Sequence, residues 1–325
     1  MNFTNEQLDE AIKLSKEQQE IISRNTKIFT VICFAVNLVE IFVLCSLIDR
    51  NLIISIVIIF AVFLINFASL PLWSPIMLFA NKKTRGMYNF RELYSSSKFY
   101  IKYKNLATEC LNDFGKIDYT AVIDGYLKKE KNKYNRYILL KTKNIYLSLS
   151  GRFDEAWQAY EEALKTVPDY KKEDTVYLKL STLDDQMNGD EFIAVFDANK
   201  DEIEKTFVKG REISLINLGI VLLMSYEKFS GRYERAVEFC KMSLRINREV
   251  RFEDNIKYPN FQHIGEIEKY CALAYCYAML GDTERAVNGL DMIEERVNML
   301  TCKVPELYIN AVREISEIIA KTENK

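Results

Sequence analysis

A glycine that opens a helical pattern recurs along the chain. In its clearest copy, Gly151 precedes residues 153–168, where small and aromatic side chains return every three or four positions. Glycine accepts the positive φ angle that commonly ends a helix, and residues three or four apart lie on one face of the helix that follows. The pattern therefore predicts a tight turn and the second helix of a helical hairpin.

The same turn begins again at Gly231 and Gly281, with weaker copies at Gly189 and Gly115, so that neighbouring turn glycines are about 36 to 50 residues apart. The alanines of four copies are predicted to lie where the two helices of a hairpin touch: Ala156, Ala194, Ala236 and Ala286. The stretch from Leu149 to Pro168 resembles a tetratricopeptide repeat (TPR), whose second helix has small and aromatic residues at these offsets and whose end is marked by proline.

This resemblance implies an α-solenoid and a role in protein or peptide binding. One hairpin cannot bury its apolar face alone, so neighbouring hairpins stack and form a concave inner surface. We expect an all-α chain in which residues 81–325 form a cytoplasmic TPR-like α-solenoid of about four to five helical hairpins. The candidate first helices are 89–112, 135–149, 174–187, 211–229 and 264–280, and residues 304–322 are expected to form a C-terminal capping helix.

Two apolar runs precede the repeats, Ile28–Ile48 and Leu52–Trp73. Each has about the 20 residues that a helix needs to cross a bilayer core of about 30 Å. Because only residues 49–51 separate them, the runs predict a two-helix transmembrane hairpin within residues 28–80. A helical pair buried in a soluble core is the alternative, and the near absence of charge in both runs argues against it.

Lysine and arginine lie on both outer sides of the predicted hairpin, whereas Arg50 alone lies between the spans. Positively charged flanks remain on the cytoplasmic side, so both termini are expected to be cytoplasmic. Residues 1–27 are expected to form a cytosolic amphipathic lead-in helix, with Thr4 and Gln7 at the spacing of a capping box. The protein is thus predicted to be integral to a membrane, the cell membrane of a bacterium.

Asn37 and Glu40 lie near the middle of the first predicted span. An ionisable side chain at bilayer depth is costly, so such a residue usually faces protein or water. Three arrangements remain open for Glu40: it is protonated and bonded to Asn37 or a backbone carbonyl, it meets its copy in a homo-oligomer, or it meets a polar residue of another membrane protein. The hypothesis from the sequence is that Asn37 and Glu40 mark an intramembrane contact face.

Composition and motifs argue against several classes of function. The formal net charge of −2 disfavours nucleic-acid binding, which needs a basic surface. His263 is the only histidine, which excludes two-histidine metal sites and leaves little basis for a histidine-based triad. The acidic pairs Glu161–Glu162 and Asp184–Asp185 would point about 100° apart on a helix, so each is interpreted as part of a solvated face. No catalytic residue, metal site or cofactor is predicted, and the chain is not expected to be an enzyme.

The inner surface implied by the TPR resemblance is lined mainly by first helices. Residues ten and six positions before each turn glycine share a face there because they are four apart. These positions form the predicted partner-binding groove: Lys141, Ile145, Lys179, Leu183, Val221, Ser225, Cys271 and Tyr275. Chaperone-binding TPR domains carry a basic clamp for a peptide carboxylate at such places, but Ile145 and Leu183 replace its polar members, and the two lysines would make only a weak anion site. A mixed apolar groove for a helix or an extended segment is expected, and the alternative is that these side chains only pack against neighbouring helices.

Together these features favour a membrane-tethered TPR adaptor or scaffold that binds a protein or peptide partner at the cytoplasmic face of the bilayer. Tethering raises the local concentration of the array near membrane partners, so weak groove contacts suffice. The alternative is an integral accessory subunit of a membrane transporter or secretion complex, which contacts that complex through the transmembrane hairpin. Either function is compatible with a homo-oligomer or a membrane-protein complex.

Overall fold

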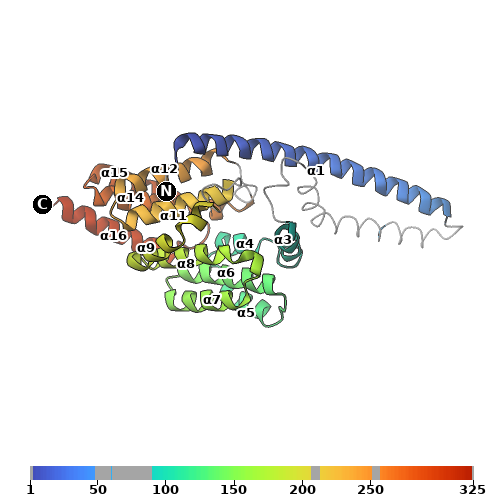
Figure 1. Ribbon diagram of the computed structural model, residues 1–325, viewed down its shortest axis with the longest axis horizontal. Helices are drawn as coiled ribbons and strands as arrows, with labels where there is room; N and C mark the ends of the chain where they lie inside the picture. The colour runs from blue at the N-terminus through green and yellow to red at the C-terminus, as the bar shows by residue number, and fades with distance from the viewer. Residues whose placement is uncertain (1–2, 48–59, 61–89, 206–212, 251–256, 324–325) are drawn as a thin grey trace. The chain divides into compact units, whose positions relative to one another are not determined.

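The computed structural model of the chain describes residues 3–47, 60, 90–205, 213–250 and 257–323 (Figure 1). Within these ranges every regular element is a helix, and the β contacts are limited to one isolated bridge between Phe114 and Ile117. The predicted all-α class is therefore confirmed. The second apolar run and the predicted turn at 49–51 lie outside the described residues, except for Phe60.

The chain divides into two compact units. The larger unit combines Met1–Ile12 with Asn105–Lys325, and the smaller unit is Lys13–Lys104. The first residues of the chain thus belong to the same unit as the repeats, although more than ninety positions of sequence, Lys13–Lys104, come between them.

Helix α1 (Asn5–Leu47) is a continuous helix of 43 residues. The predicted lead-in helix and the first apolar run therefore follow one another without a break. The predicted capping box begins this helix: the Thr4 amide donates to Gln7 Oε1 at 2.9 Å, and the Gln7 amide donates to Thr4 Oγ1 at 3.3 Å. Two backbone donors that an isolated helix start would leave unsatisfied are bonded in this way.

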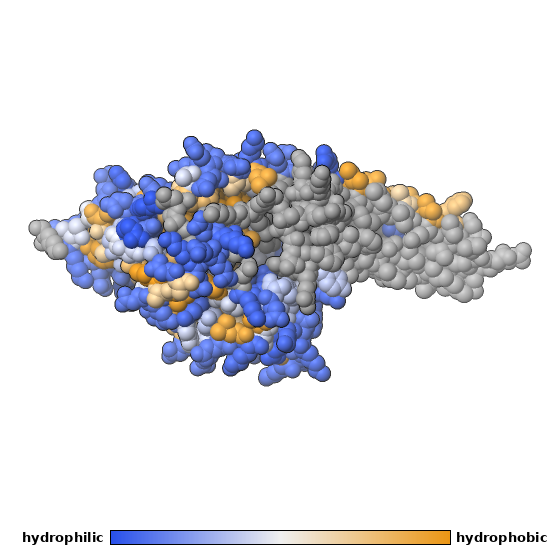
Figure 2. Space-filling model, in the orientation of Figure 1, coloured by the Kyte–Doolittle hydropathy of each residue, from blue (hydrophilic) through white to orange (hydrophobic). Residues whose placement is uncertain are grey.

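The later part of α1 carries apolar side chains at its surface. Large hydrophobic side chains that are more than half exposed include Ile28, Val31, Phe34, Leu38, Val39 and Phe42. Figure 2 shows hydrophobic surface along this helix. Among the described residues, no helix combines the length and the apolar character that crossing a bilayer requires.

Paired helices make up most of the described part of the larger unit. The pairs are α6 (Lys133–Leu149) with α7 (Phe153–Thr166), α8 (Glu173–Asp185) with α9 (Gly189–Ala198), α11 (Ile213–Phe229) with α12 (Tyr233–Glu249), and α14 (Pro259–Met279) with α15 (Thr283–Met299). The short helices α4 (Leu106–Asn112) and α5 (Tyr119–Leu127) precede these hairpins, and α16 (Glu306–Glu323) follows them. Successive hairpins pack through α6 and α8, α9 and α11, and α12 and α14, while α16 packs on α14 and α15.

Glycine forms the turn in three of these hairpins, as predicted. Gly151, Gly231 and Gly281 have φ angles of +72°, +73° and +75°. In each turn the amide that follows the glycine donates to a carbonyl five residues earlier, as Arg152 does to Leu147 at 2.9 Å. Such bonds satisfy carbonyls that lose their partners where a helix ends.

The turn between α8 and α9 differs from the prediction. Met187, and not Gly189, has the positive φ angle, +53°. Helix α9 begins at Gly189 itself, whereas the second helices of the other hairpins begin two residues after their glycine. Glycine serves a different purpose here, because a Cβ atom at position 189 would lie 2.7 Å from Cδ1 of Phe229.

This change of register moves the apolar face of α9. Ala156, Ala236 and Ala286 are fully buried, as predicted for contacts between paired helices. Ala194 is exposed, and Phe192 is fully buried instead. Two positions correspond to about 200° around a helix, so an alanine placed by the glycine spacing falls on the opposite side.

Two predicted helix boundaries were also wrong. The predicted helix 89–112 is divided at Lys104 into α3 (Phe90–Tyr103) and α4, because Lys104 has a φ angle of +53° that a right-handed helix does not contain. Helix α14 begins at Pro259 and not near residue 264. Proline suits the first turn of a helix, where its missing N–H group costs nothing.

The larger unit closes on itself. Helix α4 packs against α14, and α6 packs against α16. The side-chain amide of Asn260, which is 1% exposed, donates to the Asn112 carbonyl at 2.6 Å and to Thr301 Oγ1 at 2.9 Å, and the Thr301 amide donates back to Asn260 Oδ1 at 3.0 Å. In an open solenoid each repeat contacts only its neighbours. The closure therefore departs from the expected array and encloses the space between the first helices.

The N-terminal segment, residues 3–12, is part of the apolar core of the larger unit. Phe3, Leu8 and Ile12 are 6%, 0% and 3% exposed and belong to the same cluster as the buried side chains of α9, α11 and α12. The Asp9 carboxylate pairs with the Arg245 guanidinium at 2.7 Å. The sequence predicted a lead-in helix here but not this packing.

Candidate functional site

A hollow of about 250 Å³ lies between the first helices of the closed array. Its lining comes from the start of α7, the end of α8, and from α11, α14 and α16. One part of the lining is apolar or aromatic: Met224, Cys271, Ala272, Tyr275, Leu307, Tyr308, Ala311 and Ile315. The ionisable part consists of Asp184, Asp185, Glu268, Glu314 and Lys228. Four carboxyl groups thus face one ammonium group, and we call this space the acidic hollow.

The single ammonium group in this lining is bound to one of the carboxylates. Lys228 Nζ lies 2.7 Å from Asp184 Oδ1, and its side chain is only 10% exposed. Asp184 Oδ2 accepts a second hydrogen bond from Ser225 Oγ at 2.6 Å. Asp184 and Lys228 therefore neutralise each other, and no ammonium or guanidinium group in the lining is left to balance Glu268 and Glu314.

Glu268 on α14 and Glu314 on α16 are exposed and make no hydrogen bond or ion pair with another described residue. They approach the acidic hollow from two helices that pack against each other. Like charges that line one hollow repel one another, and a cation between them would remove that repulsion.

The negative potential of the hollow affects its other ionisable groups. Burial, followed by the carboxylates of Asp184 and Glu268, raises the pKa of Asp185 well above its ordinary value. Burial and the charge of Glu268 raise the pKa of the Cys271 thiol to about 12, and the same two causes raise the pKa of Tyr308. Burial is the main cause of these shifts, and the carboxylates of the hollow add to it.

The structure brings two of the predicted groove residues together at the acidic hollow, Cys271 and Tyr275. Ser225 lies beside it as the hydrogen-bond donor to Asp184. Leu183 is fully buried in the apolar core, and Val221 packs against that core.

The other predicted groove residues lie elsewhere on α6 and α8. Lys141 Nζ is 3.9 Å from Asp174 Oδ2, and Lys179 Nζ is 3.0 Å from Glu191 Oε1. Neither ammonium group lines the hollow, so the weak anion site considered from the sequence does not form there. Ile145 is half-buried and also lies outside the lining.

The predicted intramembrane pair lies on α1, in the smaller unit. Asn37 is half-buried and has an interaction within the chain. The side chain of Glu40 lies outside the described part of the structure.

The sequence reasoning missed the acidic side of the hollow. Glu268 is three residues before Cys271 and seven before Tyr275, so helical periodicity places all three on one face, and this signal was present. Asp185 was interpreted as part of a solvated face, but it is half-buried. Glu314 lies after Gly281, the last turn glycine, so the rule that selects residues ten and six positions before each turn glycine does not reach it.

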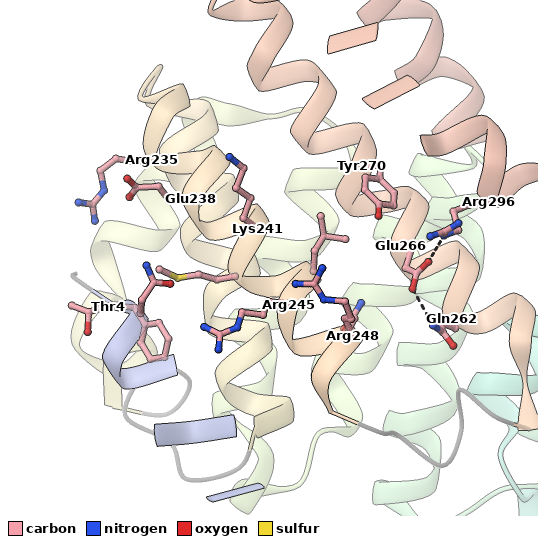
Figure 3. A pocket seen from close by; sticks show the side chains of 15 residues that line it. Thr4, Arg235, Glu238, Lys241, Arg245, Arg248, Gln262, Glu266, Tyr270 and Arg296 are labelled. Carbon is pink, nitrogen blue, oxygen red and sulfur yellow. Dashed lines mark hydrogen bonds and ion pairs between the residues drawn. The ribbon is translucent and has the colours of Figure 1, made fainter. Parts of the chain in front are cut away.

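A second, larger hollow of about 980 Å³ lies between the N-terminal segment, α12, α14 and α15 (Figure 3). Its lining includes Arg245, Arg248 and Arg296. Arg245 pairs with Asp9 at 2.7 Å and with Glu249 at 2.6 Å, and Arg296 pairs with Glu266, as the dashed line in Figure 3 marks. The chain itself neutralises two of these arginines, whereas Arg248 is exposed and has no ion pair with a described residue. The acidic hollow is the better candidate for a ligand site because it combines an apolar lining with two unpaired carboxylates.

The described residues define an all-α protein in which stacked helical hairpins enclose an acidic hollow. In that part of the chain, no three histidine, cysteine, aspartate or glutamate side chains are grouped so that they could hold a metal ion. Comparisons with protein-family models, curated proteins and solved structures found no match to this chain.

The Asp185→Asn variant is expected to be more stable than the parent near neutral pH. Because the folded-state pKa of Asp185 is raised, the folded chain holds a proton that the unfolded chain has released, and stability falls as pH rises through this window. Asparagine does not ionise and so does not lose this stability. The free energies of unfolding of Asp185→Asn and the parent should therefore differ near pH 7 and become equal below about pH 4, the ordinary carboxyl range.

The measurement is thermal unfolding of the full chain in a mild detergent across this pH range. A gain on the order of 1 kcal/mol corresponds to about 2 to 4 °C in a unit of this size. Asp291→Asn, on the exposed side of α15, is the matched control and should show no such pH-dependent difference. Equal melting temperatures for Asp185→Asn and the parent at every pH would contradict the raised pKa.

Proposed function

We propose that this chain is a membrane-tethered adaptor of TPR-like architecture, which holds a segment of a partner protein or peptide in the acidic hollow. The observation that carries the proposal is the hollow itself, whose lining is contributed by first helices of different hairpins. Mixed apolar and charged concave surfaces of this kind are typical of recognition sites.

The size of the hollow favours a peptide over a small molecule. Pockets for small molecules usually measure about 300 to 1,000 Å³. The acidic hollow, at about 250 Å³, lies just below that range. It suits one or two side chains of an extended segment, whose remaining residues would lie along the neighbouring helices.

The TPR-like part of the proposal rests on the sequence resemblance and is supported by the turn geometry. Three hairpins have the predicted glycine in the left-handed region, and the alanines that follow each of these glycines are fully buried between helices. The proposed architecture remains a TPR-like α-solenoid with α16 as its cap.

The tether is proposed to be the hairpin at residues 28–80, with both termini in the cytoplasm. The exposed apolar side chains of α1 support it, because a row of large hydrophobic side chains in water is unfavourable by about 25 cal/mol for each Å². Extended apolar surfaces on proteins usually mark contact with a membrane or another protein. The charge asymmetry of the flanking segments supports the orientation.

Photocrosslinking in intact cells tests the proposal. Tyr275, in the acidic hollow, is replaced by photoreactive benzoylphenylalanine in the full chain, and membranes are washed with carbonate before irradiation. We expect the chain to stay in the membranes and to form an adduct whose crosslinked partner peptide is identified by mass spectrometry. Tyr126, which is 40% exposed on α5 and lies outside the hollow, is the control position.

The two halves of the proposal can fail separately in this experiment. Adducts from Tyr275 that are no more frequent than those from Tyr126 would argue against a partner in the hollow. Release of the chain by the carbonate wash would argue against the tether.

A further inference from the structure

Carboxyl groups and apolar side chains occupy different parts of the lining of the acidic hollow, and this arrangement limits the kinds of ligand that fit it. The carboxyl groups come from the end of α8, from α14 and from α16, while Met224, Ala272 and Tyr308 supply apolar surface between them. An occupant that suits this lining has an apolar stem and a positive end. Lysine and arginine side chains have this build, since their methylene stems pack on apolar surface while the charged group reaches polar partners.

Anionic occupants do not suit the site. A peptide carboxylate or phosphate would approach four carboxyl groups, and the one nearby ammonium, that of Lys228, already bonds to Asp184 at 2.7 Å. A metal ion does not suit it either, because the described acids are not grouped closely enough to coordinate one. Chaperone-binding TPR domains carry basic side chains that bind a peptide carboxylate, whereas this hollow carries carboxylates.

A neutral apolar side chain would fill the hollow but leave its charges unchanged. Glu268 and Glu314 have no partner among the described residues, and their repulsion persists unless a cation lies between them. A cation brought between them gains attraction from both carboxylates. The charge of the hollow thus selects among side chains of similar length.

From this complementarity, and resting on the proposed function, we infer that the acidic hollow binds a lysine or arginine side chain of the partner segment. Glu268 and Glu314 bind the charged group. Met224, Ala272 and Tyr308 pack on the stem. The Asp184–Lys228 pair is a fixed part of the wall and does not contact the partner's charge.

Selection from peptide pools on the full chain in lipid nanodiscs tests this inference. Short peptides with blocked ends carry lysine, arginine, norleucine or glutamate at a central position, and the other positions are randomised among neutral residues. Norleucine has the stem of lysine without its charge. We expect the lysine and arginine pools to be retained about tenfold more than the norleucine pool, and the glutamate pool to be retained least.

Two variants connect the preference to the named carboxylates. Glu268→Gln and Glu314→Gln should each reduce retention of the lysine pool about threefold, and the double variant about tenfold, because partly exposed ion pairs are individually weak. Retention of the norleucine pool should not change. Glu317→Gln, on the same helix as Glu314 but outside the hollow, is the control and should leave every pool unchanged. Melting temperatures equal to that of the parent show that the variants fold.

The outcomes separate this inference from the proposed function. Equal retention of the norleucine and lysine pools, or a preference for glutamate, would overturn the cationic occupant, while adducts from Tyr275 would still support the adaptor. If no pool is retained and Tyr275 forms no adduct, both ideas are wrong. A lysine preference that survives the double variant would show that the cation binds elsewhere, and would overturn the assignment to this hollow.

Discussion

Replacing Leu8 by alanine is expected to lower the free energy of unfolding of the larger unit by about 2 to 5 kcal/mol. Leu8 is fully buried in the main apolar cluster, together with side chains of α9, α11 and α12. The substitution removes buried methyl groups and leaves a cavity, and both effects destabilise a packed core. A change of this size is a large fraction of the stability of an ordinary domain.

The Leu8→Ala substitution should also have a local effect on the N-terminal segment, in addition to lowering the stability of the whole unit. Hydrogen exchange of the full chain should show faster exchange of the amides in residues 5–12, because their helix loses its main contact with the rest of the unit. Leu14→Ala is the matched control: Leu14 lies on the same helix but is 37% exposed, and its truncation should change the melting temperature by much less. If the two variants are equally stable, the N-terminal segment does not contribute to the core.

The role of residues 3–12 also determines which protein should be used in experiments. A fragment that starts at residue 81 would lack Phe3, Leu8 and Ile12, and so would leave part of the main apolar cluster uncovered. Loss of partner binding by such a fragment would not separate a missing tether from a damaged core. The binding and crosslinking experiments therefore use the full chain.

The sequence pattern predicted the local geometry well wherever glycine determined it. Gly151, Gly231 and Gly281 adopt the left-handed conformation, and the alanines that follow them are buried, because a positive φ angle and a close helix contact each require a particular residue type. At position 189 glycine is required for another reason, which is the close approach of the Phe229 side chain. One glycine gives no sign of which cause applies, so the register of α9 was assigned wrongly.

Closure of the array could not be predicted from periodicity. It depends on single polar contacts between distant positions, such as those of Asn260 with Asn112 and Thr301, and these residues have no repeat spacing. The acidic hollow forms because of the closure, since the capping helix α16 packs beside the first helices α6 and α14. This is why the spacing rule found Cys271 and Tyr275 but not Glu314.

A glycine-to-alanine pair provides the second large test, because the two substitutions should have opposite signs. Alanine in place of glycine normally stabilises a helix by about 0.5 to 1 kcal/mol. Gly125 in α5 follows this rule, as nothing lies within 4 Å of a Cβ atom built there. We therefore expect Gly125→Ala to raise the melting temperature slightly.

Gly289→Ala is expected instead to destabilise the larger unit by about 1 to 3 kcal/mol, or about 2 to 4 °C for each kcal/mol. A Cβ atom at position 289 would lie 2.8 Å from Ala274 Cβ and 3.2 Å from Ala274 Cα. The second atom belongs to the backbone of α14, so no side-chain rotation relieves the clash and the two helices of the hairpin must move apart. Thermal unfolding of both variants in the same detergent gives the comparison. A Gly289→Ala variant as stable as Gly125→Ala would mean that α14 and α15 do not approach as closely as described, and the buried contact at Ala286 would then be in doubt as well.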